Sequence, residues 1–139
     1  MELLDIVAVQ DLLHRFWGAL DDRDYDVLVA QMTPDCEWQR AGHLHHGRDE
    51  VLTAMRARPI NLAIRHVITN LRVDAVDNGL RARGLLTAYM HNFADGEAGP
   101  YPGSPPAFVA DTTAFCVKGN GGYLIDKLTA ALVFRSAAH

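Results

Sequence analysis

Residues 64–93 read IRHVITNLRVDAVDNGLRARGLLTAYMHNF, two long runs rich in β-branched and aromatic residues on either side of Asp77-Asn78-Gly79. An Asn-Gly pair between two such runs favours a tight antiparallel hairpin. Two more runs of this kind follow at residues 107–118 and 123–135, separated by a Gly-Asn-Gly-Gly turn. The second half of the chain therefore predicts four long antiparallel strands.

The first 60 residues predict mainly helices. Apolar residues recur every three or four positions from Leu3 to Leu20, which defines one face of a helix. Residues 25–32 predict a short second helix, residues 36–41 a short strand and residues 47–58 a third helix. Helices grouped before an antiparallel sheet indicate the α+β class, with the sheet wrapped around the first helix.

Length and charge limit the kinds of protein this chain can be. Its 139 residues are 49% apolar and 22% charged, which suits one globular domain over residues 1–139. A net charge of -4 provides no basic surface for nucleic acid. No apolar run is long enough to span a membrane, and the first residues carry acids where a signal peptide carries bases. We expect a cytoplasmic domain with neither nucleic acid nor a membrane as partner.

Neither the cysteines nor the clustered histidines have the spacing of a metal site. Cys36 and Cys116 are far apart and form no CxxC motif, so two buried thiols are the simpler interpretation, and a disulfide stays open. His43, His45 and His46 occupy a polar connection before a helix and lack the further ligands of a zinc site. We predict no bound metal.

Asp21 is the first residue that suggests chemistry. It continues the series Leu13 and Trp17 at steps of four, so it faces the core from the end of the first helix. A buried carboxylate requires a partner. The alternative is that Asp21 only ends the helix in a polar turn.

Two strand histidines are the next candidates. His66 shares one strand face with Ile64 and Ile68, and His91 shares a face of the next strand with Tyr89 and other polar or aromatic residues. We expect the two imidazoles to converge across the hairpin. For each one alone, a hydrogen-bonded structural histidine is the alternative.

Polar and aromatic residues on the strands extend the candidate site. Asp111 and Thr113 alternate with apolar residues on one strand, so this pair either enters the interior or faces a dimer partner. Large aromatic residues form either core or the wall of a ligand cavity. They are Trp17, Trp38, Tyr89, Phe93 and Phe115.

Four stretches carry a resemblance to a known superfamily: AVQDLL, LDDRDYDVL, IRHVITNLRV and YMHNF. With the order of elements, they resemble the nuclear transport factor two-like superfamily, in the branch of SnoaL-like cyclases, ketosteroid isomerase and scytalone dehydratase. The resemblance covers almost the whole chain. It implies a cone-shaped α+β barrel in which three N-terminal helices pack on a strongly curved antiparallel sheet.

The resemblance also implies a set of acid/base residues. Asp21, His66 and His91 match the aspartate and two histidines of scytalone dehydratase, and Asp21 and His66 match the Asp/His dyad of the dehydrochlorinase that acts on hexachlorocyclohexane. The substrate-recognition residues differ, because Leu20 and Arg40 stand where the dehydratase has its two tyrosines. Asp111 and Thr113 fall near a serine and an asparagine of that enzyme.

These implications give a functional expectation. The protein would be a cofactor-free lyase or isomerase, dehydratase-like, in which His66 acts as the base, Asp21 holds it and His91 returns the proton. The substrate would be small, hydrophobic and ring-containing, such as a polyketide, steroid or aromatic-pathway intermediate. The expected substrate-binding residues are Trp17, Trp38, Arg40, Tyr89, Phe93, Asp111, Thr113 and Phe115.

Two alternatives remain open: a polyketide cyclase-like enzyme, and a non-catalytic ligand-binding or dimerisation module resembling the small subunit of aromatic ring dioxygenases. We also expect a homodimer, because the outer face of a curved sheet usually needs covering, with Val67, Leu71 and Val73 supplying apolar area. The Gly/Pro-rich loop 94–106 is either a lid or a passive surface excursion.

Overall fold

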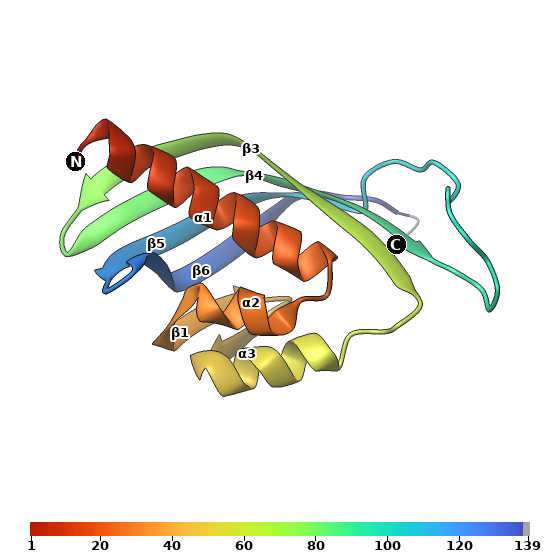
Figure 1. The fold of residues 1–139 in the computed structure, drawn as a ribbon. Helices are drawn as coiled ribbons and strands as arrows, with labels where there is room; N and C mark the ends of the chain where they lie inside the picture. The colour runs from red at the N-terminus through yellow and green to blue at the C-terminus, as the bar shows by residue number, and fades with distance from the viewer. Residues whose placement is uncertain (138–139) are drawn as a thin grey trace.

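The structure is a computed structural model that describes residues 1–137. It combines three helices with one six-stranded sheet, so the expected α+β class is confirmed (Figure 1). In chain order the elements are α1 (Leu3–Asp21), α2 (Tyr25–Ala30), β1 (Met32–Arg40), β2 (His43–His46), α3 (Gly47–Arg56), β3 (Leu62–Val76), β4 (Gly79–Asn92), β5 (Phe108–Gly119) and β6 (Gly122–Arg135).

The sheet is mixed, which corrects the expectation of a wholly antiparallel one. Its strand order is β2-β1-β6-β5-β4-β3, and β1 runs parallel to β6 while every other pair is antiparallel. The short strand predicted at residues 36–41 corresponds to β1. Its parallel partner is β6, at the far end of the chain, and local sequence gives no signal of that pairing. The connection predicted at residues 43–46 is strand β2, paired with β1 through Trp38 and His45.

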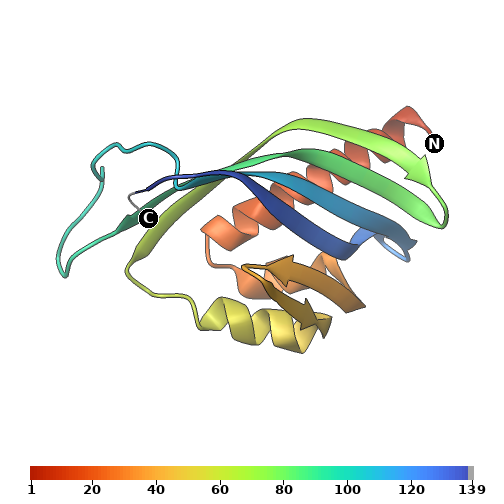
Figure 2. The ribbon, with the colours of Figure 1, turned by 180° about the vertical axis from the view of Figure 1, so that it is seen from behind.

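Helix α1 lies across one face of the long strands, whereas the other face carries no helix (Figures 1 and 2). Its buried side chains recur at helical spacing and include Leu13, Phe16, Trp17 and Leu20. Helix α1 packs against β3, and α3 packs against β1. The core therefore lies between the helices and the concave face of the sheet.

A bulge bends β3 around α1. The register between β3 and β4 shifts between Thr69 and Arg72, and Asn70 inside this shift has a φ of 55°. Gly84 lies opposite, where a Cβ atom would come within 2.8 Å of the Thr69 carbonyl oxygen. Any side chain at position 84 would push the two strands apart, so this glycine allows the bend.

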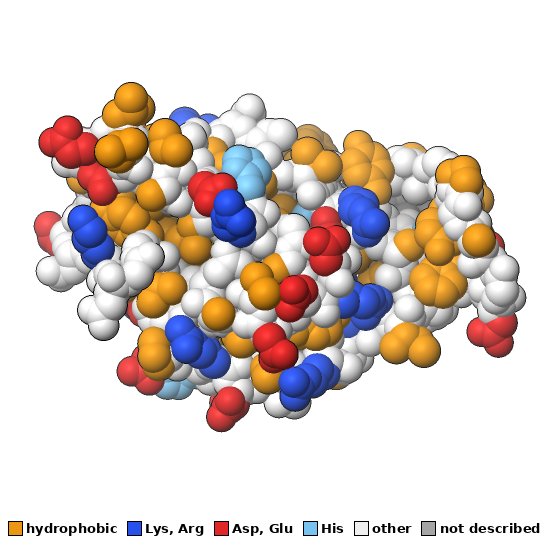
Figure 3. Space-filling view, viewed as in Figure 1, with side chains coloured by type: hydrophobic (Ala, Val, Ile, Leu, Met, Phe, Trp, Pro, Cys, Tyr) orange, Lys and Arg blue, Asp and Glu red, His pale blue; other side chains and the backbone are white. Residues whose placement is uncertain are grey.

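The structure of residues 1–137 also answers three questions about membrane spans, surface charge and the cysteines. No helix there is long and apolar enough to cross a membrane. The face that carries the helices mixes acidic and basic side chains without a large patch of either sign (Figure 3). Cys36 and Cys116 are both buried and free, so the disulfide left open by the sequence is not formed.

Candidate functional site

Asp21 and His66 form the most buried of the ion pairs in the described chain. The carboxylate ends α1, and the imidazole comes from β3. The His66 backbone N–H donates to Asp21 Oδ2 at 2.7 Å, and His66 Nδ1 lies 2.6 Å from Asp21 Oδ1. The two side chains are only 6% and 8% exposed. Both oxygens of Asp21 are therefore used to hold one residue, which answers the requirement for a partner.

The carboxylate also decides which nitrogen of the ring is free. An ionised carboxylate only accepts hydrogen bonds, so the proton of a neutral His66 lies on Nδ1 and the lone pair on Nε2. The Trp17 ring lies against the imidazole, with the two ring centroids 4.9 Å apart. The ring is thus fixed from two sides, and its Nε2 edge is the one left for a reactant.

His66 lines a cavity of about 420 Å³ between α1, the sheet and the end of β1. This volume lies within the range of small-molecule sites. Asp21 is not part of the wall. It therefore lies behind His66, which separates the carboxylate from the cavity. Most of the wall is apolar or aromatic. It comprises Trp17, Leu20, Trp38, Ala41, Gly42, Leu62, Ile64, Leu86, Met90, Phe108, Ala110, Ala130 and Leu132, with Gln39, Arg40, Arg58 and His66 as its polar members.

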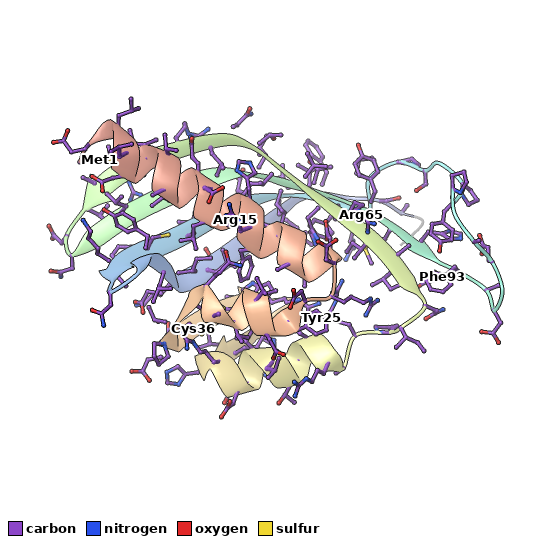
Figure 4. All side chains as sticks on the ribbon, viewed as in Figure 1. Met1, Arg15, Tyr25, Cys36, Arg65 and Phe93 are labelled. Carbon is purple, nitrogen blue, oxygen red and sulfur yellow. The ribbon has the colours of Figure 1, made fainter. Side chains whose placement is uncertain are left out.

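Of the wall residues, Trp17, Trp38 and Arg40 were expected from the sequence, whereas Arg58 was not. Arg58 follows α3 and is 7% exposed. Its Nη1 donates to the Leu20 carbonyl at 3.2 Å and to the Tyr25 hydroxyl at 3.0 Å (Tyr25 is labelled in Figure 4). An arginine at a helix end can bond the last carbonyls of its own helix, and that is the only contact its position in the sequence suggests. Only tertiary structure carries Arg58 to the end of α1, so no local signal could have found it.

The expectation that His66 and His91 converge is wrong. In the β3–β4 register His66 pairs with Ala88, and His91 pairs with Ala63. Residues 63 and 66 are an odd number of positions apart, so the His91 side chain lies on the opposite face of the sheet from that of His66. Tyr89 and Phe93 share the outer side with His91, and none of the three lines the cavity. Figure 4 shows Phe93 at the far end of β4, where the strand enters the loop.

Asp111, Thr113 and Phe115 also face outward, contrary to expectation. The buried positions of β5 are Ala110, Thr112, Ala114 and Cys116. The three residues expected in the site alternate with these and therefore lie on the other face of the strand. The small inward residues leave room for the large side chains of α1. Because the outward positions of β5 are also partly apolar, alternation alone could not decide which face is inside.

The loop 94–106 packs on the outer face of the sheet and supplies no residue to the cavity wall. Tyr101 stacks on His91 and Phe93, with ring centroids 5.1 and 5.6 Å apart. His91 Nε2 lies 2.9 Å from Glu97 Oε2. The Ala94 backbone N–H donates to Glu97 and is the main cause that holds the pKa of this carboxyl below its usual value. The loop is therefore tied down on the side away from His66, and the lid expectation has no support.

The clustered histidines do not form a metal site in the described part of the chain. His43 and His45 lie on the edge strand β2 with their ring centroids 4.8 Å apart. Burial and the neighbouring His43 lower the pKa of His45. No group of three His, Cys, Asp or Glu side chains within residues 1–137 is arranged to hold a metal ion.

Comparison with known proteins places this geometry in a family. No curated protein matches the chain in sequence. A cystatin-like fold protein of unknown function from Nostoc punctiforme superposes with a TM-score of 0.79 at 19% identity, over 95% of this chain and 93% of that one. A candidate scytalone dehydratase from Novosphingobium aromaticivorans gives 0.78 at 17% identity, over 99% and 89%. ActVI-ORFA from Streptomyces coelicolor gives 0.73 at 13% identity, over 91% and 96%.

At these identities the solved structures establish the fold alone, a cystatin-like or nuclear transport factor two-like α+β fold. The sequence itself goes further, because residues 1–129 match the model of a SnoaL-like domain. The resemblance inferred from the sequence motifs is therefore confirmed, and the chain belongs to the SnoaL-like domain family.

Proposed function

We propose that the protein is a lyase or isomerase of the dehydratase type, in which His66 is the base and Asp21 holds it. The substrate is a small, hydrophobic molecule that contains a ring. The observation that carries this proposal is the 2.6 Å contact between His66 Nδ1 and Asp21 Oδ1 at the wall of a cavity of about 420 Å³. A neutral imidazole anchored through Nδ1 keeps the Nε2 lone pair for a proton of the substrate.

In the proposed dehydration, His66 Nε2 takes a proton from a carbon next to a carbonyl group. The electron pair of the broken C–H bond forms a C=C bond, and the hydroxyl on the adjacent carbon leaves as water with the proton of the imidazolium. In an isomerisation the imidazolium returns the proton to another carbon. The Asp21 charge favours the imidazolium at this stage, and positioned proton transfer typically contributes about 10²–10⁴ in rate. His91 has no part, because it lies on the other face of the sheet.

The rival class is a non-catalytic binding or dimerisation module with a purely structural Asp/His pair. In that case protein atoms would enclose both sides of the imidazole, whereas His66 forms part of the cavity wall. This placement argues against an Asp/His pair sealed in the core, and the proton-exchange test below separates an enzyme from a ligand-binding module. A polyketide cyclase-like reaction needs the same base and cavity, and differs in that the carbanion attacks a second carbonyl of the same molecule. The products distinguish it from a dehydration, because ring closure alone releases no water.

The test is base-catalysed exchange of the α-protons of β-tetralone in deuterium oxide, followed by nuclear magnetic resonance. This neutral ring ketone requires no knowledge of the natural substrate. We expect the protein to accelerate exchange and His66→Asn to abolish the acceleration. His14→Asn is the matched control, because His14 is exposed on α1. Equal exchange rates for the wild type and His66→Asn would contradict the proposal.

We also propose that a second copy of the chain covers the outer face of the sheet. The strand registers join Val67, Thr87, Val109 and Phe134 into one row across four strands on that face. Val67 is 44% exposed and Phe134 is 69% exposed. Leu71 and Val73, which were expected to contribute, pack instead against the core. Exposed apolar side chains such as Val67 and Phe134 on a face without helices are typical of an interface.

A further inference from the structure

We propose that the substrate of this cavity carries a carboxylate, which Arg40 and Arg58 bind. The inference rests on the proposed function in that it concerns the same cavity, and it names the substrate class more closely as hydrophobic ring compounds with one acidic group. It concerns binding, so it can be tested without catalysis.

The charges of the cavity wall are unbalanced. Arg40 and Arg58 both line it, and no aspartate or glutamate does. Asp21 contacts His66 from outside the wall, and both of its carboxylate oxygens are occupied by that residue. Among the ion pairs of residues 1–137, none involves either arginine. Two guanidinium groups without a counter-ion in a largely apolar cavity are costly unless a ligand supplies the negative charge.

Arg58 is held in place and still has donors to offer. Its two side-chain hydrogen bonds, to Leu20 and Tyr25, both use Nη1, and its guanidinium carbon lies 6.0 Å from the centre of the Tyr25 ring. A guanidinium has five N–H donors in a fixed fork, so those on Nη2 and Nε remain without an acceptor in the described chain. This arrangement suits a carboxylate, which accepts two parallel hydrogen bonds from one arginine.

Arg40 is even less engaged. It is half-buried, its guanidinium carbon lies 5.8 Å from the centre of the Trp38 ring, and its side chain makes no hydrogen bond to a described residue. Burial and the charge of Arg58 lower the pKa of Arg40. The two guanidinium groups therefore repel one another. An anion in the cavity that contacts both of them would offset this repulsion.

The rest of the wall is mostly apolar or aromatic. The wall therefore combines a large apolar area with the unpaired donors of two arginines, which suits a ring that bears a group of acceptor oxygens.

A monoanion fits this place better than a phosphate. The carboxyl end of α1 lies here, because Arg58 donates to the Leu20 carbonyl in its last turn. A helix carboxyl end carries partial negative charge, which disfavours a dianion, whereas phosphate sites usually use helix amino ends. We therefore assign a carboxylate.

The experiment is calorimetric titration with β-naphthoate and with its neutral analogue, β-naphthamide. We expect the wild type to bind the carboxylate about tenfold or more tightly than the amide, as charge-assisted hydrogen bonds imply. Arg40→Gln should remove most of this preference and leave the Kd of the amide within about twofold. The Arg40 side chain has no hydrogen bond to described residues and its backbone pairing in β1 is unaffected by the change, so this variant should fold. Arg58→Lys, which keeps the charge and loses the fork, should reduce the preference less.

Two further variants separate this inference from the proposed function. Arg72→Gln is the matched control, since Arg72 is an exposed residue of β3 outside the cavity, and it should leave both affinities unchanged. His66→Asn should lose proton exchange and keep the preference for the carboxylate. The inference is overturned if the wild type binds the amide as tightly as the carboxylate or fails to bind the carboxylate. It is also overturned if Arg72→Gln weakens carboxylate binding as much as Arg40→Gln, or if His66→Asn abolishes the preference.

Discussion

Asp21→Asn is the most informative single change, because it keeps the shape of the side chain and converts one acceptor into a donor. In the wild type Oδ2 accepts from the His66 backbone N–H at 2.7 Å, and Oδ1 contacts Nδ1 at 2.6 Å. An asparagine amide has one acceptor oxygen, so it can satisfy only one of these two groups. If the oxygen stays with the backbone, the amide NH₂ faces Nδ1. The ring proton then moves to Nε2, and the base is lost.

The expected loss follows from these contacts. A hydrogen bond to a charged group contributes roughly 1.5–3 kcal/mol, which corresponds to about tenfold to a hundredfold in rate. The tautomer change adds to this, so exchange of the β-tetralone α-protons should fall by about a hundredfold or more. The stability cost is that of one buried hydrogen bond, roughly 1–3 kcal/mol, and Tm should fall by less than about 10 °C.

Asp22→Asn is the matched control, because it makes the same change at an exposed neighbour. It should leave the exchange rate unchanged. The double variant Asp21→Asn with His66→Asn should lose no more activity than His66→Asn alone, since the two residues act as one unit. Additive losses, or an Asp21→Asn rate equal to that of Asp22→Asn, would refute the dyad. Loss of folding without a specific loss of exchange would favour the structural pair.

Three further outcomes are expected. Burial raises the pKa of the Cys36 thiol and raises that of Cys116 to about 12, so neither should react with a thiol reagent at neutral pH until the protein is unfolded; rapid labelling of the native protein would contradict this. Sedimentation should show a dimer that Phe134→Glu dissociates, and a monomeric wild type would exclude it. The lowered pKa of Glu97 means that its support of the loop after β4 is complete above the ordinary carboxyl pKa and is lost as pH falls through the lower folded value. The protection of the loop amides, relative to their intrinsic exchange rates, should therefore fall in acid; the same acid step in Glu97→Gln would show that Glu97 is not its cause.

The sequence predicts what depends on local patterns. The apolar stripe of residues 3–20 defines α1, and its continuation to Asp21 places the carboxylate on the inner side of the helix. The period of two in β3 places His66 on the same side as Ile64. Because β3 packs against α1, the Asp21 carboxylate and the His66 imidazole, each predicted to face inward, contact one another.

What the sequence misses depends on packing between distant segments. The pattern of β5 predicts the wrong inward face because its inward residues, such as Ala110 and Ala114, are small, whereas the bulky Phe115 faces outward. Which face of β5 turns inward depends on how the whole sheet packs under the helices, and no single strand pattern contains that information. The parallel pairing of β1 with β6, and the contact of Arg58 with the end of α1, likewise join segments far apart in sequence.

The chain contains only two tryptophans, and both belong to the cavity wall. Trp17 lies against the imidazole of His66, and Trp38 lies beneath the Arg40 guanidinium. Light absorbed at the red edge of the indole band therefore excites this wall and no other part of the molecule. The intrinsic fluorescence of the protein is a built-in reporter of whatever enters the cavity, so unlabelled compounds can be screened for binding before any reaction is known.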